Sequence, residues 1–290
     1  MGKKKTSRWN ELCESVKEDD GLPTRESGPW AKEKLWYWNR YTEITTQSMV
    51  GKPAWKAGVV YVDLFAGPGV CTIRGTNERC PGSPLIAAGA PKPFTKILLC
   101  EKDKVLADAC ESRLAERLPA GQFGMFAGDC NSRIDELCSE IPPRALTLAF
   151  LDPTGLHLWF ETVQTLSRCG RVDLLILLPD AVDIMRNVDQ LYFEQPDSNL
   201  DRVLGPDSNW REAKAKLEST EPSVERRLYA SIYELQLRRH AGYKHFAEEV
   251  IQGPHGPLYR LIYATKHPRG IDFWDKSIKK EFGGQQRLPF

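Results

Sequence analysis

Four acidic residues of this chain end or follow apolar segments that have the composition of buried strands. They are Asp63, Glu101, Asp129 and Asp152. In an open parallel sheet the carboxyl ends of the strands meet at one edge, and ligands bind in the crevice outside that edge. A carboxylate there can accept hydrogen bonds from hydroxyl or amino groups of a ligand. The pattern therefore predicts a nucleotide-type binding site at one edge of a parallel sheet.

A glycine turn follows the first of these strands, in the sequence YVDLFAGPG over residues 61–69. Glycine lets a backbone approach a ligand where side chains would collide. The spacing is not G-x-G-x-x-G and no Gly-Lys-Ser/Thr follows, which speaks against a dinucleotide or ATP site. The turn resembles motif I of the S-adenosylmethionine (SAM)-dependent methyltransferases, which implies SAM as the cofactor. An ordinary strand-to-helix turn remains the alternative. The cofactor contacts expected here are Phe65, Ala66, Gly67, Pro68 and Gly69.

Three acidic residues have a cofactor interpretation and a structural one. Asp63 either orients the glycine turn and reaches the cofactor through water, or caps the loop backbone; both need a paired carboxylate. Glu101 is placed to accept the two hydroxyls of a ribose, as the acidic residue of dinucleotide enzymes does, or is a solvent-facing strand end. Asp129 either accepts the adenine amino group or is the N-cap of a helix beginning at Asn131.

The sequence DPTG at residues 152–155 resembles the D/N-P-P-aromatic tetrad of amino-methylating enzymes, in which an acidic side chain and a carbonyl hold the target amine. Asp152 and Pro153 match the tetrad, and we predict them to be catalytic. Thr154 and Gly155 do not match it. The candidates for the missing ring are His157, Trp159 and Phe160, and we predict His157 and Trp159 to contact the substrate. A polar helix start is the alternative for His157.

The long loop over residues 70–82 carries two further substrate candidates, Arg74 and Arg79. It covers the cofactor or is a solvated loop. Basic and aromatic side chains together form the surface that single-stranded nucleic acid prefers. The alternative is that the tryptophans are core residues and the basic residues a solvated face. The basic clusters are Lys3, Lys4, Lys5 and Arg8; Arg238, Arg239 and His240; and Lys276, Lys279 and Lys280. The aromatic candidates are Trp36, Trp38 and Trp274.

Strand and helix patterns alternate regularly through the middle of the chain. Near-continuous apolar strands separated by helices indicate a parallel sheet buried on both faces. Expected strands lie at 58–65, 95–101, 123–126, 145–151 and 172–178, and a hairpin at 243–251 and 257–264. Residues 83–84 start a helix, with Ser83 expected as its N-cap and Pro84 as its first residue. The predicted fold is a Rossmann-like α/β fold: a mostly parallel seven-stranded sheet with a terminal antiparallel hairpin and helical additions at both ends.

We divide the chain into a core domain and additions. Residues 1–28 are expected to be a flexible arm, 29–56 an aromatic helix, and 57–265 the ligand-binding domain, with 180–222 an irregular insertion or lid. Residues 266–290 are expected to be a helix and tail.

Charge and composition bear on whether the chain binds nucleic acid, enters a membrane, is secreted or binds a metal. The net charge of +1 gives no overall field for nucleic acid, so such contacts would need a local patch. The chain has no apolar run long enough for a membrane span and no apolar core of a secretory signal. No pair of the eight cysteines has C-x-x-C spacing, so we expect no metal site and reduced thiols in the cytoplasm.

The motifs together resemble the three-Cys-motif partner (TcmP) family, within the SAM-dependent class I methyltransferase superfamily. The matching segments are WAKEKLWYWNRY, YVDLFAGPG, GSPLIAA, GDCN, FLDPTG and YATKHPRGIDFW, over most of residues 29–275. The family name implies a partner protein with a three-cysteine, radical-SAM-like motif; the resemblance does not imply an acceptor.

From the sequence we therefore expect a SAM-dependent methyltransferase acting on a base of RNA or DNA. A SAM-binding partner without methyl transfer of its own is one alternative, and a methyltransferase for a small molecule or protein is another.

Overall fold

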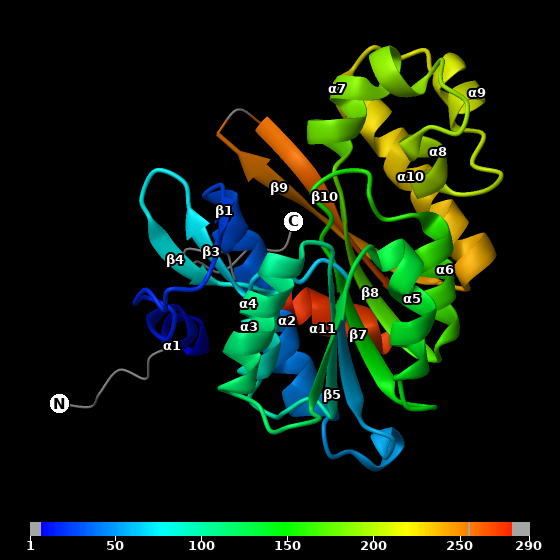
Figure 1. The fold of residues 1–290 in the computed structure, drawn as a ribbon. Helices are drawn as coiled ribbons and strands as arrows, with labels where there is room; N and C mark the ends of the chain where they lie inside the picture. The colour runs from blue at the N-terminus through cyan, green and yellow to red at the C-terminus, as the bar shows by residue number, and fades with distance from the viewer. Residues whose placement is uncertain (1–6, 255, 280–290) are drawn as a thin grey trace.

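The structure is a computed structural model, in which residues 7–254 and 256–279 are described (Figure 1). Its centre is a seven-stranded sheet in the order β6-β5-β2-β7-β8-β10-β9. Strand β10 is antiparallel to both its neighbours, whereas β6, β5, β2, β7 and β8 pair in parallel. This confirms the predicted fold. The strands are β2 (Val59–Asp63), β5 (Lys96–Glu101), β6 (Phe123–Ala127), β7 (Leu146–Leu151), β8 (Arg171–Leu178), β9 (His245–Gly253) and β10 (Gly256–Thr265).

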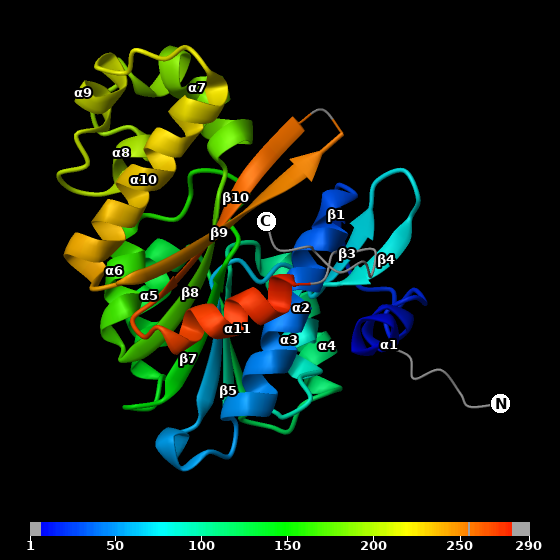
Figure 2. The same ribbon diagram turned by 180° about the vertical axis from the view of Figure 1, so that it is seen from behind.

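Helices cover both faces of this sheet. Successive side chains of a strand point to opposite faces, and here apolar side chains on both faces are buried. On β2, Val60 and Val62 pack against one set of helices, and Val59 and Tyr61 pack against the other. The first set is α5 (Cys130–Ser139), α6 (Phe160–Arg168) and α10 (Pro222–Ala241). The second is α2 (Trp30–Met49), α3 (Ser83–Ala88), α4 (Lys104–Ala115) and α11 (Arg269–Ile278), seen from behind in Figure 2. A short 3₁₀ turn, Pro53–Trp55, precedes β2.

A second, three-stranded sheet replaces the loop that the sequence predicted over residues 70–82. Strands β3 (Val70–Ile73) and β4 (Glu78–Pro81) form an antiparallel hairpin, and β1 (Arg25–Ser27) adds to β3 in parallel. The hairpin is held because Cys71, Ile73 and Cys80 are buried between it and the core. Helix α3 starts directly afterwards, with Gly82 rather than Ser83 as its N-cap.

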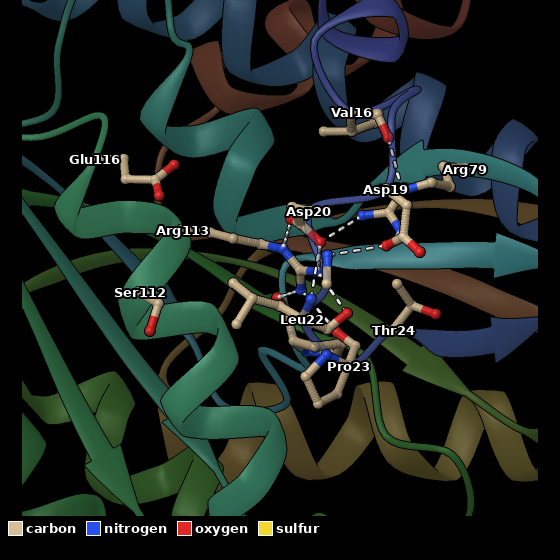
Figure 3. A network of polar contacts seen from close by, with 12 residues as sticks. Val16, Asp19, Asp20, Leu22, Pro23, Thr24, Arg79, Ser112, Arg113 and Glu116 are labelled. Atoms are coloured by element: carbon tan, nitrogen blue, oxygen red, sulfur yellow. Dashed lines mark hydrogen bonds and ion pairs between the residues drawn. The ribbon is translucent and has the colours of Figure 1, made fainter.

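Residues 7–28 are docked on the core rather than forming the flexible arm expected from their polar composition. Helix α1 (Arg8–Glu14) buries Trp9, and Val16 is buried beyond it. Asp20 receives two hydrogen bonds from Arg113, at 2.7 and 2.8 Å, and a third from Arg79 (Figure 3). Buried anchors spaced along a polar segment are not visible as a pattern in the sequence, which explains the wrong expectation. We call residues 7–28 the N-terminal segment.

The segment over residues 180–222 is helical, which corrects the expectation of an irregular insertion. It contains two π-helical turns, Asp180–Ile184 and Val188–Tyr192, and the helices α7 (Met185–Asn187), α8 (Asn199–Leu204) and α9 (Trp210–Ala215). A capping box of Ser198 and Asp201 starts α8. Leu200, Leu204 and Trp210 are buried in the core cluster that contains α6 and α10, so apolar anchors fix the segment despite its polar composition.

Two of the three tryptophans proposed as stacking platforms are core residues. Trp38 and Trp274 are both 0% exposed, and the Trp274 ring stacks on Tyr263 at 5.3 Å between centroids. Trp36 is half-buried beneath the Arg40 guanidinium. Lys3, Lys4, Lys5 and Lys280 lie outside the described residues. Within the described part of the chain, no helix is long and apolar enough to cross a membrane.

Candidate functional site

The glycine turn after β2 has backbone angles that favour glycine at two positions. Gly67 has φ +61° and Gly69 has φ +83°, both in the left-handed region. The Gly67 N–H donates to Glu101 Oε2 at 2.8 Å, and the Ala66 N–H donates to the Cys100 carbonyl at 3.0 Å. On the far side, the Gly82 N–H donates to the Gly69 carbonyl at 2.7 Å. The turn is therefore fixed by β5 and by the start of α3.

Asp63 lies beneath this turn and is completely buried. The Tyr61 hydroxyl donates to its Oδ2 at 2.9 Å and the Phe65 N–H donates to its Oδ1 at 3.0 Å. Burial raises the pKa of Asp63 to about 7, although hydrogen bonds from Ser83, Phe65 and Tyr61 oppose the shift. Asp63 lines neither of the cavities described next. This arrangement corresponds to the structural interpretation, a carboxyl group that caps the loop.

Two adjoining cavities lie above the carboxyl ends of the central strands. The larger has a volume of about 440 Å³ and the smaller about 350 Å³. Both lie in the range of ligand-binding pockets. They share three lining residues, Arg25, Phe65 and Thr154. The larger cavity contains the rest of the glycine turn, from Ala66 to Gly69, and the smaller contains the ends of β5 and β6.

The smaller cavity brings together Glu101 and Asp129, the two residues for which the sequence analysis expected contacts with the ribose and the adenine. Glu101 is only 5% exposed, and its Oε1 accepts the Asp103 N–H at 3.0 Å. Asp129 is the N-cap of α5, because its Oδ1 accepts the Asn131 N–H at 3.0 Å. Burial raises the pKa of Asp129, but the Asn131 N–H and the Lys102 ammonium outweigh it, so the pKa lies below its usual value. N-capping does not prevent a ligand contact, since a carboxylate has several acceptor positions.

Asn131 is a residue of this cavity that the sequence analysis missed. Its Nδ2 donates to Asp129 at 2.9 Å and to the His157 carbonyl at 2.8 Å. Its Oδ1 accepts from the Trp159 N–H at 3.1 Å and from the Thr162 hydroxyl at 2.7 Å. One side chain thus joins the start of α5 to the segment between β7 and α6. The GDCN sequence was the only signal for it.

The larger cavity contains Asp152 and Pro153. Lys34 of α2 forms an ion pair with Asp152, and its ammonium lies 5.7 Å from the centre of the Tyr259 ring. Tyr259 of β10 is 6% exposed, and its hydroxyl has no hydrogen-bond partner among the described residues. Burial and the Asp152 charge both raise the pKa of Tyr259. A carboxylate, an ammonium and a phenol therefore meet in this cavity, and the last two come from segments distant in sequence.

The four proposed substrate residues are distributed differently. Arg74 lines the larger cavity and is paired with Glu26 at 2.6 Å. Arg79 lines neither cavity and instead binds Asp19 and Asp20 of the N-terminal segment, at 2.9 and 2.8 Å. His157 and Trp159 line the smaller cavity, not the larger one that contains Asp152. The ring beside Asp152 is that of Tyr259, which no motif in the sequence indicated.

The strand order, with one antiparallel strand next to the last position, defines the Rossmann-like class I methyltransferase fold. No family model matches the chain, the TcmP family included, and no curated protein matches it.

Solved structures resemble it at low sequence identity. A protein from Legionella pneumophila is 12% identical, with coverage of 88% of this chain and 93% of that one, and a TM-score of 0.47. An O-methyltransferase from Bacillus cereus in complex with SAH is 11% identical, with coverage of 91% and 92% and a TM-score of 0.44. A putative RNA methyltransferase from Pyrococcus horikoshii is 15% identical, with coverage of 88% and 96% and a TM-score of 0.39. Similarity at this level says nothing about the activity or substrate of this chain.

Proposed function

We propose that the protein is a SAM-dependent methyltransferase that binds SAM across the two adjoining cavities. The observation that carries this proposal is their arrangement around the glycine turn. The smaller cavity has the carboxylates of Glu101 and Asp129, the larger has that of Asp152 together with Ala66 to Gly69 of the turn, and Phe65 at the start of the turn lines both. An elongated ligand with an adenosine group at one end, an amino-acid group at the other and its reactive centre between them suits such a pair of cavities.

The residues present fit SAM at both ends. Glu101 would accept the ribose hydroxyls, and Asp129 and Asn131 would contact the adenine. The amino-acid end would lie against the turn, where Gly67 and Gly69 present no side chain. Bound SAM would supply an electrophilic methyl group. The chain's own contribution would be to hold the acceptor in line and exclude water, which is the main source of acceleration in such transfers.

For the acceptor we propose an amine of a base in RNA or DNA. Its N–H would donate to Asp152, next to Pro153, and the Tyr259 hydroxyl offers a further hydrogen bond that nothing among the described residues uses. Tyr259 would also provide the ring that Thr154 and Gly155 lack. Arg74 at the same cavity would contact phosphate. A small molecule or a protein could present the same amine, and for those acceptors Arg74 would be dispensable.

A second candidate function is a SAM-binding partner that transfers no methyl group itself. The observation in its favour is the ion pair between Lys34 and Asp152. The Asp152 carboxylate, which an acceptor amine would need as a hydrogen-bond acceptor, is already bound to the lysine ammonium. The TcmP resemblance points the same way, toward a partner protein with a three-cysteine, radical-SAM-like motif.

Calorimetric titration of SAM and of S-adenosylhomocysteine into the purified protein tests the cofactor site. We expect micromolar binding, and a loss of about tenfold or more in Glu101→Ala, since a ribose is held by charge-assisted hydrogen bonds. Asp108→Asn, on the exposed face of α4, is the control and should bind like the wild type. Absence of binding by a folded wild-type protein would refute the proposal.

Transfer of a labelled methyl group from SAM then distinguishes the two candidate functions. Transfer to tRNA, rRNA or DNA supports the nucleic-acid methyltransferase. Transfer only to protein or small molecules keeps the enzyme and replaces the acceptor. SAM binding with no transfer to any of these pools supports the nonenzymatic partner.

A further inference from the structure

Arg25 differs from the other cations that line the two cavities. Lys34 is paired with Asp152, Arg74 with Glu26, and Lys102 with Asp129. The side chain of Arg25 has no hydrogen bond or ion pair with any residue in the described part of the chain, although the residue is half-buried. A half-buried guanidinium is partly removed from water, and an anionic ligand in the cavity would compensate for that loss.

Arg25 lies at the boundary of the two cavities and over the glycine turn. It is one of the three residues that line both cavities. A Cβ atom built on Gly67 would lie 4.0 Å from Arg25 Nη1, with no closer heavy atom outside its chain neighbours. The guanidinium therefore faces the part of the turn where glycine leaves room for a ligand.

The backbone that carries Arg25 is fixed from two sides. On one side, β1 pairs with β3 and sets Arg25 opposite Cys71, and the Thr24 and Thr72 hydroxyls are 2.8 Å apart. On the other, Arg113 donates to the Pro23 carbonyl at 2.8 Å and to the Pro68 carbonyl of the glycine turn at 2.6 Å. One side chain thus holds both Pro23, two residues before Arg25, and the turn, so the backbone that carries Arg25 is fixed above the turn.

We propose that Arg25 binds the carboxylate at the amino-acid end of SAM. This inference rests on the proposed function and adds an anion-binding residue to it. A guanidinium can bind a carboxylate through two parallel N–H···O bonds, which makes arginine the preferred partner of this group. Of the lysines and arginines lining the cavities, Arg25 is the one without an ion pair to residues 7–254 or 256–279, and it faces the turn that would receive this end of the cofactor.

The test compares two ligands that differ by one carboxylate: S-adenosylhomocysteine and its decarboxylated analogue, S-(5′-adenosyl)-3-thiopropylamine. We expect Arg25→Gln to weaken S-adenosylhomocysteine binding by about 10- to 100-fold, the usual range for a charge-assisted pair. Binding of the decarboxylated analogue should change less than about twofold. Arg25→Lys keeps the charge without the planar fork and should be intermediate. Lys17→Gln removes a charge from the exposed part of the N-terminal segment and is the matched control.

Each other outcome overturns the assignment in a different way. Equal loss for both ligands in Arg25→Gln would mean that Arg25 shapes the site without binding the carboxylate. Unchanged affinity for both, with loss of nucleic-acid binding, would assign Arg25 to a substrate phosphate instead. If the folded wild-type protein binds neither ligand, the proposed cofactor itself is wrong. Binding of both ligands by the wild type without discrimination by the variants leaves the cofactor standing and refutes only the role of Arg25.

Discussion

The two cavities are constructed in different ways from the same sheet. The smaller one is lined mostly by residues at the ends of strands β5, β6 and β7 or in the segments after them, such as Glu101, Asp129 and His157. The larger one is completed by Lys34 of α2 and Tyr259 of β10, which are far from those strands in sequence, whereas Arg25 of β1 lines both cavities. The first is therefore a local product of strand-to-helix junctions, whereas the second depends on how the ends of the chain pack.

This difference separates the features that any protein with this fold shares from those that depend on the additions to this chain. Strand ends are brought together by any parallel sheet, and the same edge serves many ligands. The larger cavity requires the N-terminal segment, α2 and the terminal hairpin to be in place. We therefore expect changes in these additions to affect the larger cavity and the glycine turn before they affect the smaller cavity.

The largest effect is expected for Arg113→Met, which breaks the link between the N-terminal segment and the glycine turn. Arg113 is 1% exposed and binds Asp20 and three backbone carbonyls, those of Leu22, Pro23 and Pro68. Removing a buried cation that satisfies so many acceptors costs about 3–5 kcal/mol. Urea unfolding measures the loss, and limited proteolysis should show faster cleavage within residues 7–28.

Arg117→Met, one turn further along α4, is the control for that variant. Its side chain is 33% exposed and donates to one carbonyl, so a change within about 0.5 kcal/mol is expected. If Arg113→Met costs no more than this control and the segment stays protected, Arg8 and the buried Trp9 hold the segment instead, and the two cavities are less separable than we infer.

The sequence predicted the smaller cavity better than the larger one, for a physical reason. Buried strands can be predicted from their apolar composition, and the sheet fixes the position of the residues at the end of each strand. Glu101 and Asp129 were proposed on this basis. Lys34 and Tyr259 lie within a helix and a strand whose local patterns indicate only burial or exposure. Their meeting at Asp152 is set by tertiary packing, which no local pattern contains.

Two errors of the sequence analysis have the same origin. Residues 7–28 and 180–222 were expected to be flexible or irregular because they are polar, yet both are held by few, well-separated buried groups such as Trp9, Arg113 and Trp210. The consequence for the site is direct, since Arg25 belongs to the first of these segments and was not proposed at all.

The pH dependence of the free energy of unfolding tests how the glycine turn is held, because Asp63 lies beneath that turn. Its pKa is raised to about 7 by complete burial, against 3.8 for the ordinary group. At pH values between 3.8 and about 7, the folded state therefore binds more protons than the unfolded state. The contribution of Asp63 to the free energy of unfolding is fully present below that range and is lost as pH rises through about 7. Each unit corresponds to about 1.4 kcal/mol, and the loss amounts to a few kcal/mol.

Asp63→Asn should remove this dependence. Urea unfolding between about pH 4 and pH 8 should show the variant gaining stability relative to the wild type as pH rises. A smaller slope of the same sign remains in both proteins, because burial also raises the pKa of Asp173, to about 6. Parallel curves would mean that the donors from Tyr61, Phe65 and Ser83 keep the carboxylate ionised despite its burial.

The smallest effect, on the larger cavity, concerns the Lys34–Asp152 pair. The two side chains are 13% and 19% exposed, so their attraction is only partly screened. We expect Lys34→Met to cost about 1–2 kcal/mol by leaving Asp152 without its cation. Asp152→Asn in the same background should recover part of the loss, with a coupling energy of about 1 kcal/mol in a double-mutant cycle.

The size of that coupling energy bears on the function of the larger cavity as well as on its stability. A clear coupling means that an acceptor amine must displace Lys34 to reach Asp152, and so must bring binding energy from elsewhere, such as Tyr259. A coupling near zero, measured by urea unfolding of the four proteins, means that Asp152 gains little from its cation and is available to a substrate. The first result makes the larger cavity selective for acceptors with additional contacts; the second removes the main observation in favour of a SAM-binding partner without transfer.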